Sequence, residues 1–471
     1  MDLNKIYSSN RTGASTKQEH ARSIYRRDYD RIIFSSAFRR LQNKTQVFPL
    51  PGSIFVHNRL THSLEVSSVG RSLAVIAGGY IESHYRKHLS EESQAFYLYD
   101  LQDVIASACL CHDIGNPSFG HSGEDAIAEY FRERENNENF KSLFNEHQWA
   151  DLVNFEGNAN AIRCLTSQQL GKESGGLGLT YSTLASIMKY PCSSLAINKK
   201  IIHRKKFGYL YADREIFLEI AEQTGMLPDK TSLKEFENNR LKPDIYFRHP
   251  FVWLVEAADD ICYNIIDLED AHRLRIIEHQ ECVDVFVRLL NELDGKETES
   301  IKKRLSSIGD KNSQIAYLRA KAINFLILRS GELFIQNFES ILNGSLNKAL
   351  YDIIKDDTKS LCYIGDFSYE NIYNHRSVVE IENAGFNVIR ELLNHFIPPV
   401  LKPKNERRKI EEKAVNLIPR QFLFETDDAY MKVLGVIDYI SGMTDNYAVD
   451  LYKRIKGIDM GMNSGSMSFS K

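Results

Sequence analysis

Apolar residues recur at helical spacing along this chain, and that periodicity constrains the fold more than any other feature. Between residues 60 and 78 they stand close to the 3.6-residue period of an α-helix, at Leu60, Leu64, Val69, Leu73 and Ile76. The 471 residues include only 26 Gly and 11 Pro, so helix-breaking residues are scarce. We therefore predict an all-α, mainly helical protein with few or no strands. Further helices are predicted over residues 103–111, 181–188, 251–271, 313–333 and 378–396.

The charge balance excludes one class of protein and leaves another open. The chain has 59 Lys and Arg against 63 Asp and Glu, a net charge of −4, which excludes a polycationic nucleic-acid coat. A local basic pocket for a phosphorylated small molecule remains compatible with it. The seven cysteines are odd in number and mostly lie in apolar runs, so we expect buried thiols rather than disulfides. The absence of a signal-peptide pattern and of a run of about 18 apolar residues predicts a cytoplasmic protein without a membrane span.

The densest group of chemically reactive residues lies between positions 111 and 125, in CHDIGNPSFGHSGED. His112 and Asp113 are adjacent at the end of an apolar helix, where the backbone turns and both side chains can converge on one ion. An imidazole nitrogen and a carboxylate oxygen together suit a divalent metal. The alternative is a helix-terminal histidine that interacts with the helix dipole, followed by an aspartate that begins a loop.

Two distant segments favour the metal interpretation. His62 stands at the start of the helix predicted over residues 60–78. Asp259, Tyr263 and Asp267 follow one another at intervals of four on the 251–271 helix and therefore share one face of it. A carboxylate on an otherwise apolar helix is costly unless a cation compensates its charge, and a metal ion would do so. The alternative is a solvated helix face, for which the surrounding apolar residues leave little room.

The four residues His62, His112, Asp113 and Asp259 match the H…HD…D signature of the HD-domain phosphohydrolases. Seven longer segments resemble the bacterial deoxyguanosinetriphosphate triphosphohydrolase family, and this resemblance spans residues ~20–455, nearly the whole chain. The resemblance implies an HD-domain helical core elaborated by additional C-terminal helices. The segments are FRRLQNKTQVFP (38–49), NRLTHSLEV (58–66), HDIGNPSFGHSGE (112–124), FEGNANAIR (155–163), LTYSTLASIMKYP (179–191), EAADDICYNIIDLEDA (256–271) and DYISGMTDNYAVDLY (438–452).

The resemblance implies a reaction and a cofactor. A dNTP, either dGTP or another, would be cleaved between its 5′-oxygen and the α-phosphorus to give a deoxynucleoside and inorganic triphosphate. The cofactor would be Mn²⁺, Mg²⁺ or an iron-group ion, among which the sequence does not choose. Two alternatives are an HD phosphohydrolase that acts on another nucleotide phosphoester and a nucleic-acid-responsive regulator with a degenerate site. The implied metal ligands are His62, His112, Asp113 and Asp259.

The resemblance also assigns a catalytic pair. His121 would be the general acid beside the alkoxide leaving group, which is poor and needs a proton. Glu124 would orient the imidazole of His121 and raise its pKa. For Glu124 the alternative is a first-turn carboxylate that the helix dipole favours, and the two roles are compatible.

Substrate contacts follow from the same resemblance. Arg59 and Lys189 would bind the triphosphate, and Gln46 would read the sugar edge. Tyr263 would pack on the deoxyribose and Asp267 would bond its 3′-hydroxyl. A tight tyrosine wall at C2′ would exclude ribonucleotides, because their 2′-hydroxyl would clash or lose its hydration.

Three further features each carry more than one interpretation or lack an assignment. Asn158 is either a polar group of the active site or part of a structural turn. The basic stretch 199–206 is either a solvated surface or part of a phosphate or single-stranded nucleic-acid groove. The nucleobase is predicted to be read near Tyr369, Tyr373 and Arg376, without a residue-level assignment.

The organisation of the chain is predicted from the same data. Residues 1–310 would form the HD-domain catalytic core with an N-terminal substrate-binding segment. Residues 311–460 would form a helical region that completes the nucleotide pocket and an oligomer interface. The tail, 461–471, has low complexity and is predicted to be disordered. The resemblance further implies a homo-oligomer, a hexamer or tetramer, and a single-stranded DNA or nucleotide effector.

Overall fold

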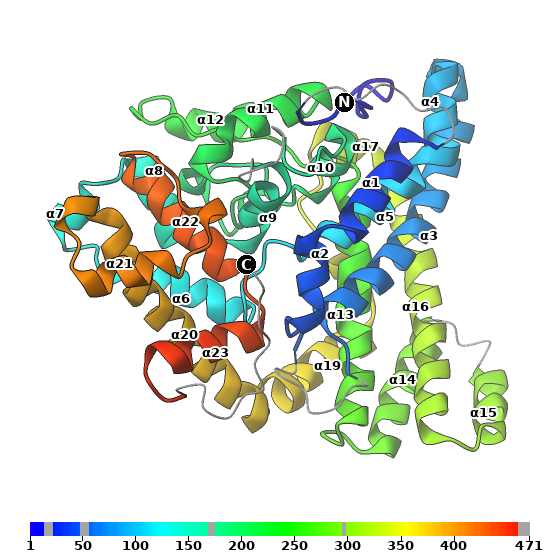
Figure 1. The fold of residues 1–471 in the computed structure, drawn as a ribbon. Coiled ribbons are helices and arrows are strands. Elements are labelled where there is room, and N and C mark those ends of the chain that lie inside the picture. Colours follow the sequence, from blue (N-terminus) through cyan, green and yellow to red (C-terminus); the bar gives the residue numbers. More distant parts are fainter. Residues whose placement is uncertain (14–21, 48–55, 168–174, 294–297, 460–471) are drawn as a thin grey trace.

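The computed structural model describes residues 1–13, 22–47, 56–167, 175–293 and 298–459, and these ranges are built from helices (Figure 1). Within them, extended backbone pairs only as isolated β-bridges, for example between Thr45 and Asn58. The all-α prediction is therefore confirmed. Over the same ranges, every helix is too short or too polar to cross a membrane. The predicted tail, 461–471, lies outside the described residues.

The helices have the following bounds. In the first half of the chain they are α1 (Ile24–Ile33), α2 (Ser36–Arg40), α3 (Arg59–Tyr85), α4 (Glu91–Ala95), α5 (Leu101–Cys111), α6 (His121–Arg132), α7 (Glu138–Lys141), α8 (Glu146–Val153), α9 (Gly157–Thr166), α10 (Tyr181–Ile187), α11 (Arg214–Gln223) and α12 (Lys230–Leu233). In the second half they are α13 (Val252–Arg273), α14 (His279–Leu293), α15 (Thr298–Ser307), α16 (Lys311–Gln336), α17 (Phe338–Asn343), α18 (Leu350–Asp357), α19 (Lys359–Ser368), α20 (Arg376–Leu401), α21 (Lys409–Asn416), α22 (Ala429–Ser441) and α23 (Asp445–Ile455). Each helix predicted from periodicity is present, and α3, α16 and α20 extend beyond both of their predicted ends.

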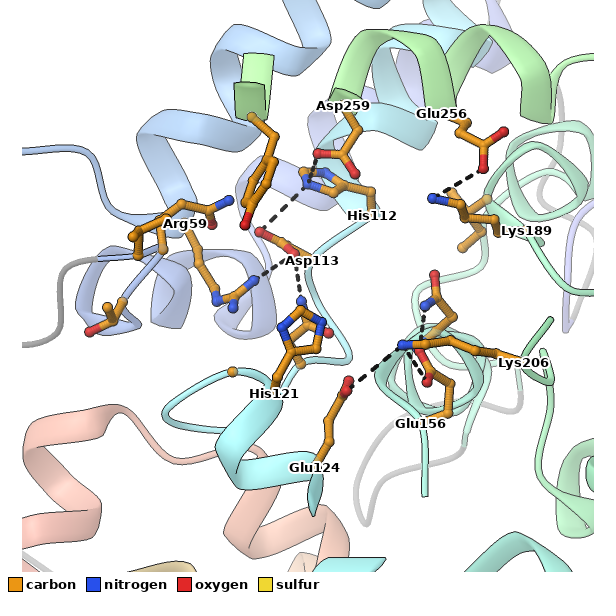
Figure 2. A pocket seen from close by; sticks show the side chains of 18 of the residues that line it. Arg59, His112, Asp113, His121, Glu124, Glu156, Lys189, Lys206, Glu256 and Asp259 are labelled. Carbon is orange, nitrogen blue, oxygen red and sulfur yellow. Dashed lines mark hydrogen bonds and ion pairs between the residues drawn. The ribbon is translucent and has the colours of Figure 1, made fainter. Parts of the chain in front are cut away.

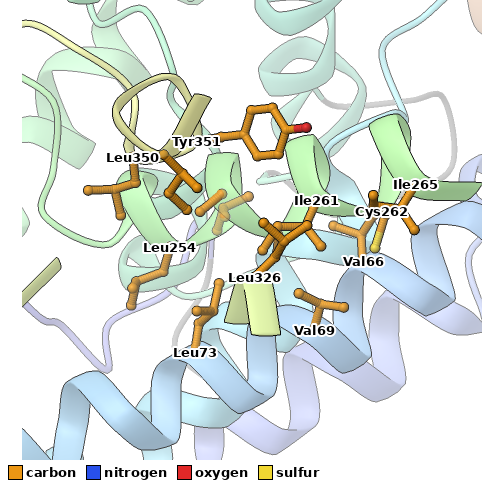
Figure 3. Close-up of a cluster of buried hydrophobic side chains, with 14 of the residues drawn as sticks. Val66, Val69, Leu73, Leu254, Ile261, Cys262, Ile265, Leu326, Leu350 and Tyr351 are labelled. Atoms are coloured by element: carbon orange, nitrogen blue, oxygen red, sulfur yellow. The ribbon is translucent and has the colours of Figure 1, made fainter. Parts of the chain in front are cut away.

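The first hydrophobic core lies between α3, α5, α13 and α16 (Figure 1). Val69 and Leu73 of α3 point toward α13 and α16, where Ile261 and Leu326 meet them (Figure 3). All four side chains are buried, and burying an aliphatic side chain of this size contributes about 1.5–3 kcal/mol. The apolar stripes detected in the sequence are thus the faces by which the long helices pack.

A second core joins helices that are far apart in the chain. Helices α6 and α8 pack with α20, α22 and α23 around buried residues such as Phe131, Leu392 and Ile437. The first core in turn extends from the N-terminus through α16 to Val378 at the start of α20. Buried packing therefore crosses the boundary proposed at residue 310, and the division into a catalytic and a nucleotide-pocket region stays a prediction about function.

Helix ends position the residues singled out by the sequence. Helix α5 stops at Cys111, so that His112 is its C-terminal cap, and α6 starts at His121. Helix α3 begins after Asn58, whose side chain accepts hydrogen bonds from the N–H groups of Leu60 and Thr61. Three helix ends thus meet beside the middle of α13.

Two glycines of α3 provide a stability test of this packing. A methyl group at buried Gly70 would lie 2.5 Å from Sγ of Cys109 on α5, whereas nothing lies within 4 Å of the same position at exposed Gly79. Gly70→Ala should destabilise the fold by about 1–3 kcal/mol through overpacking. Gly79→Ala should stabilise it by up to about 1 kcal/mol through helix propensity. Urea unfolding of both variants measures the difference, and equal effects would contradict the described α3–α5 contact.

Candidate active site

Two histidines and an aspartate from three different helices come together at the junction of the helix ends. The ligand atoms of His62, His112 and Asp259 all lie within 4.8 Å of one another. Nε2 of His62 is 3.1 Å from Oδ1 of Asp259, and Nε2 of His112 is 3.4 Å from the same oxygen. Residues separated by 197 positions in the chain therefore face one point in space. Figure 2 shows two members of the cluster, His112 and Asp259.

The donor atoms of this cluster are arranged to receive a cation. Nδ1 of His112 is 2.6 Å from the carbonyl oxygen of Cys109, so this nitrogen carries the proton and Nε2 presents its lone pair. Nε2 of His112 and Oδ2 of Asp113 are buried and have no hydrogen-bond partner among the described residues. Two buried acceptors without a donor are costly, and a divalent cation would satisfy both.

Asp113 lies beside the three-residue cluster and is held on its other side. Its Oδ2 is 3.5 Å from Nε2 of His112. Its Oδ1 accepts hydrogen bonds from Nη1 of Arg59 at 2.7 Å and from Nδ2 of Asn116 at 2.5 Å. Hydrogen bonds from the protein thus fix Oδ1 of Asp113, whereas Oδ2 faces the cluster, as expected of an oriented metal ligand.

The electrostatics of the cluster keep its carboxylates ionised. Burial alone would raise the pKa of Asp259, but the neighbouring imidazoles of His112 and His62 hold it well below its usual range. Burial also opposes ionisation of Asp113, and the Arg59 guanidinium lowers the pKa of that carboxyl. Both carboxylates are therefore available as ligands at neutral pH.

The cluster forms one wall of a cavity of about 490 Å³. Lysines lie across the cavity from it (Figure 2). Nζ of Lys189 is 3.2 Å from Glu256, and Nζ of Lys206 is 2.7 Å from Glu156. Glu124 and Glu156 raise the pKa of Lys206 although its burial opposes them. Two cations thus face a cavity that is large enough for a nucleotide.

His121 is the first residue of α6, and its side chain is exposed to the cavity. Desolvation and the cationic Lys206 and Arg59 lower the pKa of His121. Gly120, just before it, has φ +55° and lies under Arg59, because a Cβ there would be 2.7 Å from Nη2. The turn into α6 therefore requires a residue without a side chain.

Glu124 has contacts other than those expected of it. Its Oε1 accepts a hydrogen bond from the Gly157 N–H at 2.8 Å, and its Oε2 lies 4.0 Å from Nζ of Lys206. Within the described ranges no hydrogen bond joins it to His121. The expectation that Glu124 orients the imidazole of His121 and raises its pKa is therefore not met here, since α6 directs the carboxylate toward α9. Burial, with Glu156 nearby, raises the pKa of Glu124 to about 8.

The far end of the cavity is aromatic. The rings of Tyr263 and Tyr373 are stacked with centroids 5.8 Å apart, and both line the cavity together with exposed Tyr369. Asp267 lies behind them and accepts a hydrogen bond from the Tyr373 hydroxyl at 2.6 Å. Burial raises the pKa of Asp267 to about 8. Gln46 lines the cavity, and its buried Oε1 has no partner among the described residues.

Comparison with known proteins identifies the family. A model of the HD domain matches residues 59–184, and a model of the phosphohydrolase-associated domain matches residues 360–454. A deoxyguanosinetriphosphate triphosphohydrolase-like protein of Synechocystis sp. is 37% identical over 98% of this chain and 100% of its own length. The chain belongs to the deoxyguanosinetriphosphate triphosphohydrolase family. A deoxyguanosinetriphosphate triphosphohydrolase of Salmonella typhimurium is 30% identical, over 95% of this chain and 96% of its own length.

Membership of the triphosphohydrolase family makes the protein an enzyme of the HD phosphohydrolase class. A relative from Listeria monocytogenes, again named triphosphohydrolase-like, is 34% identical over 94% of this chain and 96% of its own length. The HD domain implies a bound divalent metal, and the cluster of His62, His112 and Asp259 is where the structure provides for one. The identity of the metal is not fixed by this cluster.

Most of the side chains proposed from the sequence line this cavity, but two of the proposed residues do not. Asp267 is absent from the described residues that line it, because Tyr373 stands in front. Arg376 is exposed and pairs with Glu380 at 2.6 Å, away from the cavity. The residues that do line the cavity are Gln46, Arg59, His112, Asp113, His121, Glu124, Asn158, Lys189, Asp259 and Tyr263, and His62 stands in the metal cluster.

The basic stretch 199–206 divides between the two interpretations considered for it. Lys199, Lys200 and Lys205 are exposed, in agreement with a solvated surface. Lys206 lines the cavity instead, and the sequence contains no signal that separates it from Lys205. Glu156, which pairs with Lys206, was missed as well, although it stands two residues before Asn158 in FEGNANAIR.

The metal cluster predicts a selective loss of bound metal. Asp259→Asn in this triphosphohydrolase-family protein should reduce the divalent metal that co-purifies with it at least tenfold, because a buried amide cannot replace the charged ligand. Asp267→Asn, two turns along the same helix, is the matched control and should retain wild-type metal content. Elemental analysis of the purified variants measures both. Equal retention by both variants would contradict the cluster as the metal site.

The raised pKa of Glu124 predicts a pH-dependent stability difference. The folded state binds this proton more tightly than the unfolded state, so the contribution of Glu124 to stability is present below about pH 4.5 and is lost as the pH rises through 8. Glu124→Gln should therefore have a higher melting temperature than the wild type at pH 8.5, and the difference should vanish near pH 5. Differential scanning calorimetry at both values tests this, and a constant difference would contradict the shift.

Proposed function

We propose that the chain is a metal-dependent dNTP triphosphohydrolase, which converts dGTP or another dNTP into a deoxynucleoside and inorganic triphosphate. The observation that carries the proposal is a single cavity with three distinct walls. The cluster of His62, His112 and Asp259 forms one wall, the lysines form a second, and the stacked Tyr263 and Tyr373 form a third. These walls match the α-phosphate, the outer phosphates and the deoxyribose of one substrate.

The proposed metal ligands are His62, His112, Asp113 and Asp259, in agreement with the buried acceptors left open at His112 and Asp113. A nitrogen and oxygen donor set of this kind suits Mn²⁺, Mg²⁺ or an iron-group ion. Once bound, the ion supplies a Lewis acid for the α-phosphate and lowers the pKa of water.

Arg59, Lys189 and Lys206 are the proposed triphosphate-binding cations. Without substrate, Glu156 pairs with Lys206, and Glu256 pairs with Lys189 at 3.2 Å and with Arg248 at 2.6 Å, so acidic partners already face the basic wall. Phosphate oxygens are stronger competitors for these ammonium groups, because they bring several negative charges at once. The glutamates would therefore hold the lysines in place until the phosphate oxygens of the substrate replace the glutamate carboxylates as their partners.

His121 is the proposed general acid for the 5′-oxygen. In the substrate-free chain its pKa is lowered by desolvation and by the nearby cations Lys206 and Arg59. A bound triphosphate would offset those cations and bring its own negative charge, and both effects favour the imidazolium. Glu124 is proposed to act on the catalytic α6–α9 region through Gly157 and Lys206 rather than by orienting the imidazole.

The sugar is proposed to lie against Tyr263, with Gln46 as its polar partner. The buried Oε1 of Gln46 is an acceptor with no described partner and is available to a sugar hydroxyl. In this arrangement Asp267 would contribute through Tyr373, whose hydroxyl donates a 2.6 Å hydrogen bond to the Asp267 carboxylate. Nδ2 of Asn158 donates a hydrogen bond to Oε1 of Glu156 at 2.6 Å and so helps to fix the part of the cavity wall that carries Lys206.

A homo-oligomer, hexamer or tetramer, and a single-stranded DNA or nucleotide effector remain predictions from family resemblance.

Product analysis with isotopic water tests the reaction. With a divalent metal and each of the four dNTPs in H₂¹⁸O, we expect deoxynucleoside and triphosphate as products, with ¹⁸O in the triphosphate because the α-phosphorus is attacked. Ion chromatography and mass spectrometry identify both. Release of phosphate, pyrophosphate or dNMP, or label in the nucleoside, would overturn the proposal.

The His121→Ala variant should bind metal normally and have a kcat for dNTP hydrolysis that is lower by about 10²–10⁴.

A further inference from the structure

The loop that connects the metal cluster to His121 is fastened to a distant part of the chain. This loop, residues 112–120, runs from the end of α5 to the start of α6. The Ser118 hydroxyl donates to the carbonyl of Met443 at 2.9 Å. Buried Lys44 donates from Nζ to the carbonyls of Asn116 at 2.5 Å and Ser441 at 2.7 Å. The loop is thus attached to the α22–α23 turn, residues 441–445, more than 300 positions away.

Asp445 is the centre of this attachment. It is the first residue of α23 and is 0% exposed. Its Oδ1 accepts the Phe119 N–H at 3.1 Å. Its Oδ2 accepts the Thr45 N–H at 2.9 Å and the Thr45 hydroxyl at 2.6 Å. The two oxygens of one carboxylate therefore hold two different chain segments.

Those two segments are neighbouring parts of the cavity wall, joined through the same carboxylate. Thr45 and Phe119 both line the cavity. Thr45 is followed by Gln46, the proposed sugar partner, and Phe119 stands two residues before His121, the proposed general acid. The position of Asp445 therefore sets how far the sugar side of the cavity stands from the proton donor.

The backbone of the loop needs such support. Phe119 has φ +63°, a left-handed conformation that is sterically unfavourable for a residue with a side chain. Its ring lies against Gly385 of α20, where an added Cβ would be 2.3 Å from the ring. Gly385 and Asp445 both belong to the region that matches the phosphohydrolase-associated domain. This region thus holds the strained residue from two sides.

We infer that Asp445 is a positioning residue, through which the phosphohydrolase-associated region sets the relative placement of His121 and Gln46. The kinetic part of this inference rests on the proposed function, whereas the loop's dependence on Asp445 does not. Asp445 touches neither the metal cluster nor the lysines among its described contacts, so its effect on turnover is transmitted by Phe119 and Thr45.

The test uses Asp445→Asn in the full chain. The amide has nearly the shape of the carboxylate, but whichever way it turns, the N–H of either Thr45 or Phe119 faces an NH₂ group instead of an acceptor. Asp428→Asn is the matched control. Asp428 is an exposed N-terminal cap of α22 that bonds Tyr430, and asparagine caps a helix about equally well.

Hydrogen–deuterium exchange provides a readout that needs no substrate. In Asp445→Asn the amides of residues 41–47 and 112–121 should exchange at least tenfold faster, while α20 and α22 stay protected. Asp428→Asn should match the wild type. Unchanged exchange in both segments would overturn the inference, and so would loss of protection throughout the second core, because Asp445 would then serve overall stability only.

A double-mutant cycle decides whether the effect reaches His121. Asp445→Asn should lower kcat at least tenfold with wild-type metal content, yet add less than twofold when His121 is already alanine. Losses that multiply would show that Asp445 does not act through His121.

Thr45→Val is the second variant, for the case that Asp445→Asn does not fold. It removes one of the three hydrogen bonds to Asp445 and should raise KM more than it lowers kcat; an unchanged KM would contradict the inference. A wild type that hydrolyses no dNTP refutes the proposed function, and the exchange data still decide the inference.

Discussion

The need to compensate buried carboxylates beside two histidines is the constraint on which the rest of this structure depends. Asp113 is buried and Asp259, whose side chain is 29% exposed, faces the cavity, so both negative charges are partly withdrawn from water and need compensation. Arg59 compensates the first at 2.7 Å, and the imidazoles of His62 and His112 lie against the second. These contacts require the start of α3, the end of α5 and the middle of α13 to meet at one point. The two hydrophobic cores described above, and a third one that buries Leu110 and Cys111 at the end of α5, provide the packing that keeps them there.

The cavity extends the same principle to the substrate. The small net charge of −4 gives no indication that acidic and basic side chains face each other within one cavity. Glu256 and Glu156 pair with Lys189 and Lys206, the proposed ligands of the triphosphate. Since both lysines already have acidic partners, the proposed binding of a triphosphate would exchange one set of ion pairs for another. The exchange avoids the full desolvation cost of an empty basic pocket.

The sequence was sufficient for features that are local or that require only one helix. Periodicity located α3, α13 and α20, and the reasoning that a helix end lets His112 and Asp113 converge agrees with their place after α5. Features that depend on packing between distant segments were not accessible. Lys205 and Lys206 are adjacent and chemically identical, and only the path of the loop between α10 and α11 turns one outward and the other into the cavity.

The same limit applies to spacing along a helix. Asp259, Tyr263 and Asp267 share a stripe of α13 as their spacing requires, but α13 passes the cavity only over part of its length. The π-helical turn Tyr369–Tyr373 covers the last of the three, so that Asp267 meets a tyrosine hydroxyl rather than the cavity. A shared helix face therefore predicts a shared direction, whereas access to a site depends on what the next segment covers.

The interleaving of the two cores explains why the C-terminal region cannot be understood as an addition to a finished catalytic domain. The cavity is lined by His112 from the region that matches the HD domain, by Asp259 of α13, and by Tyr373 and Val378 from the region that matches the phosphohydrolase-associated domain. The loop that ends at His121 packs in the second core through Phe119, which α20 supports. A catalytic group such as the proposed general acid His121 must be held to within about 0.5 Å, which requires support from several sides. In this chain, part of that support comes from residues that stand more than 250 positions further along the sequence.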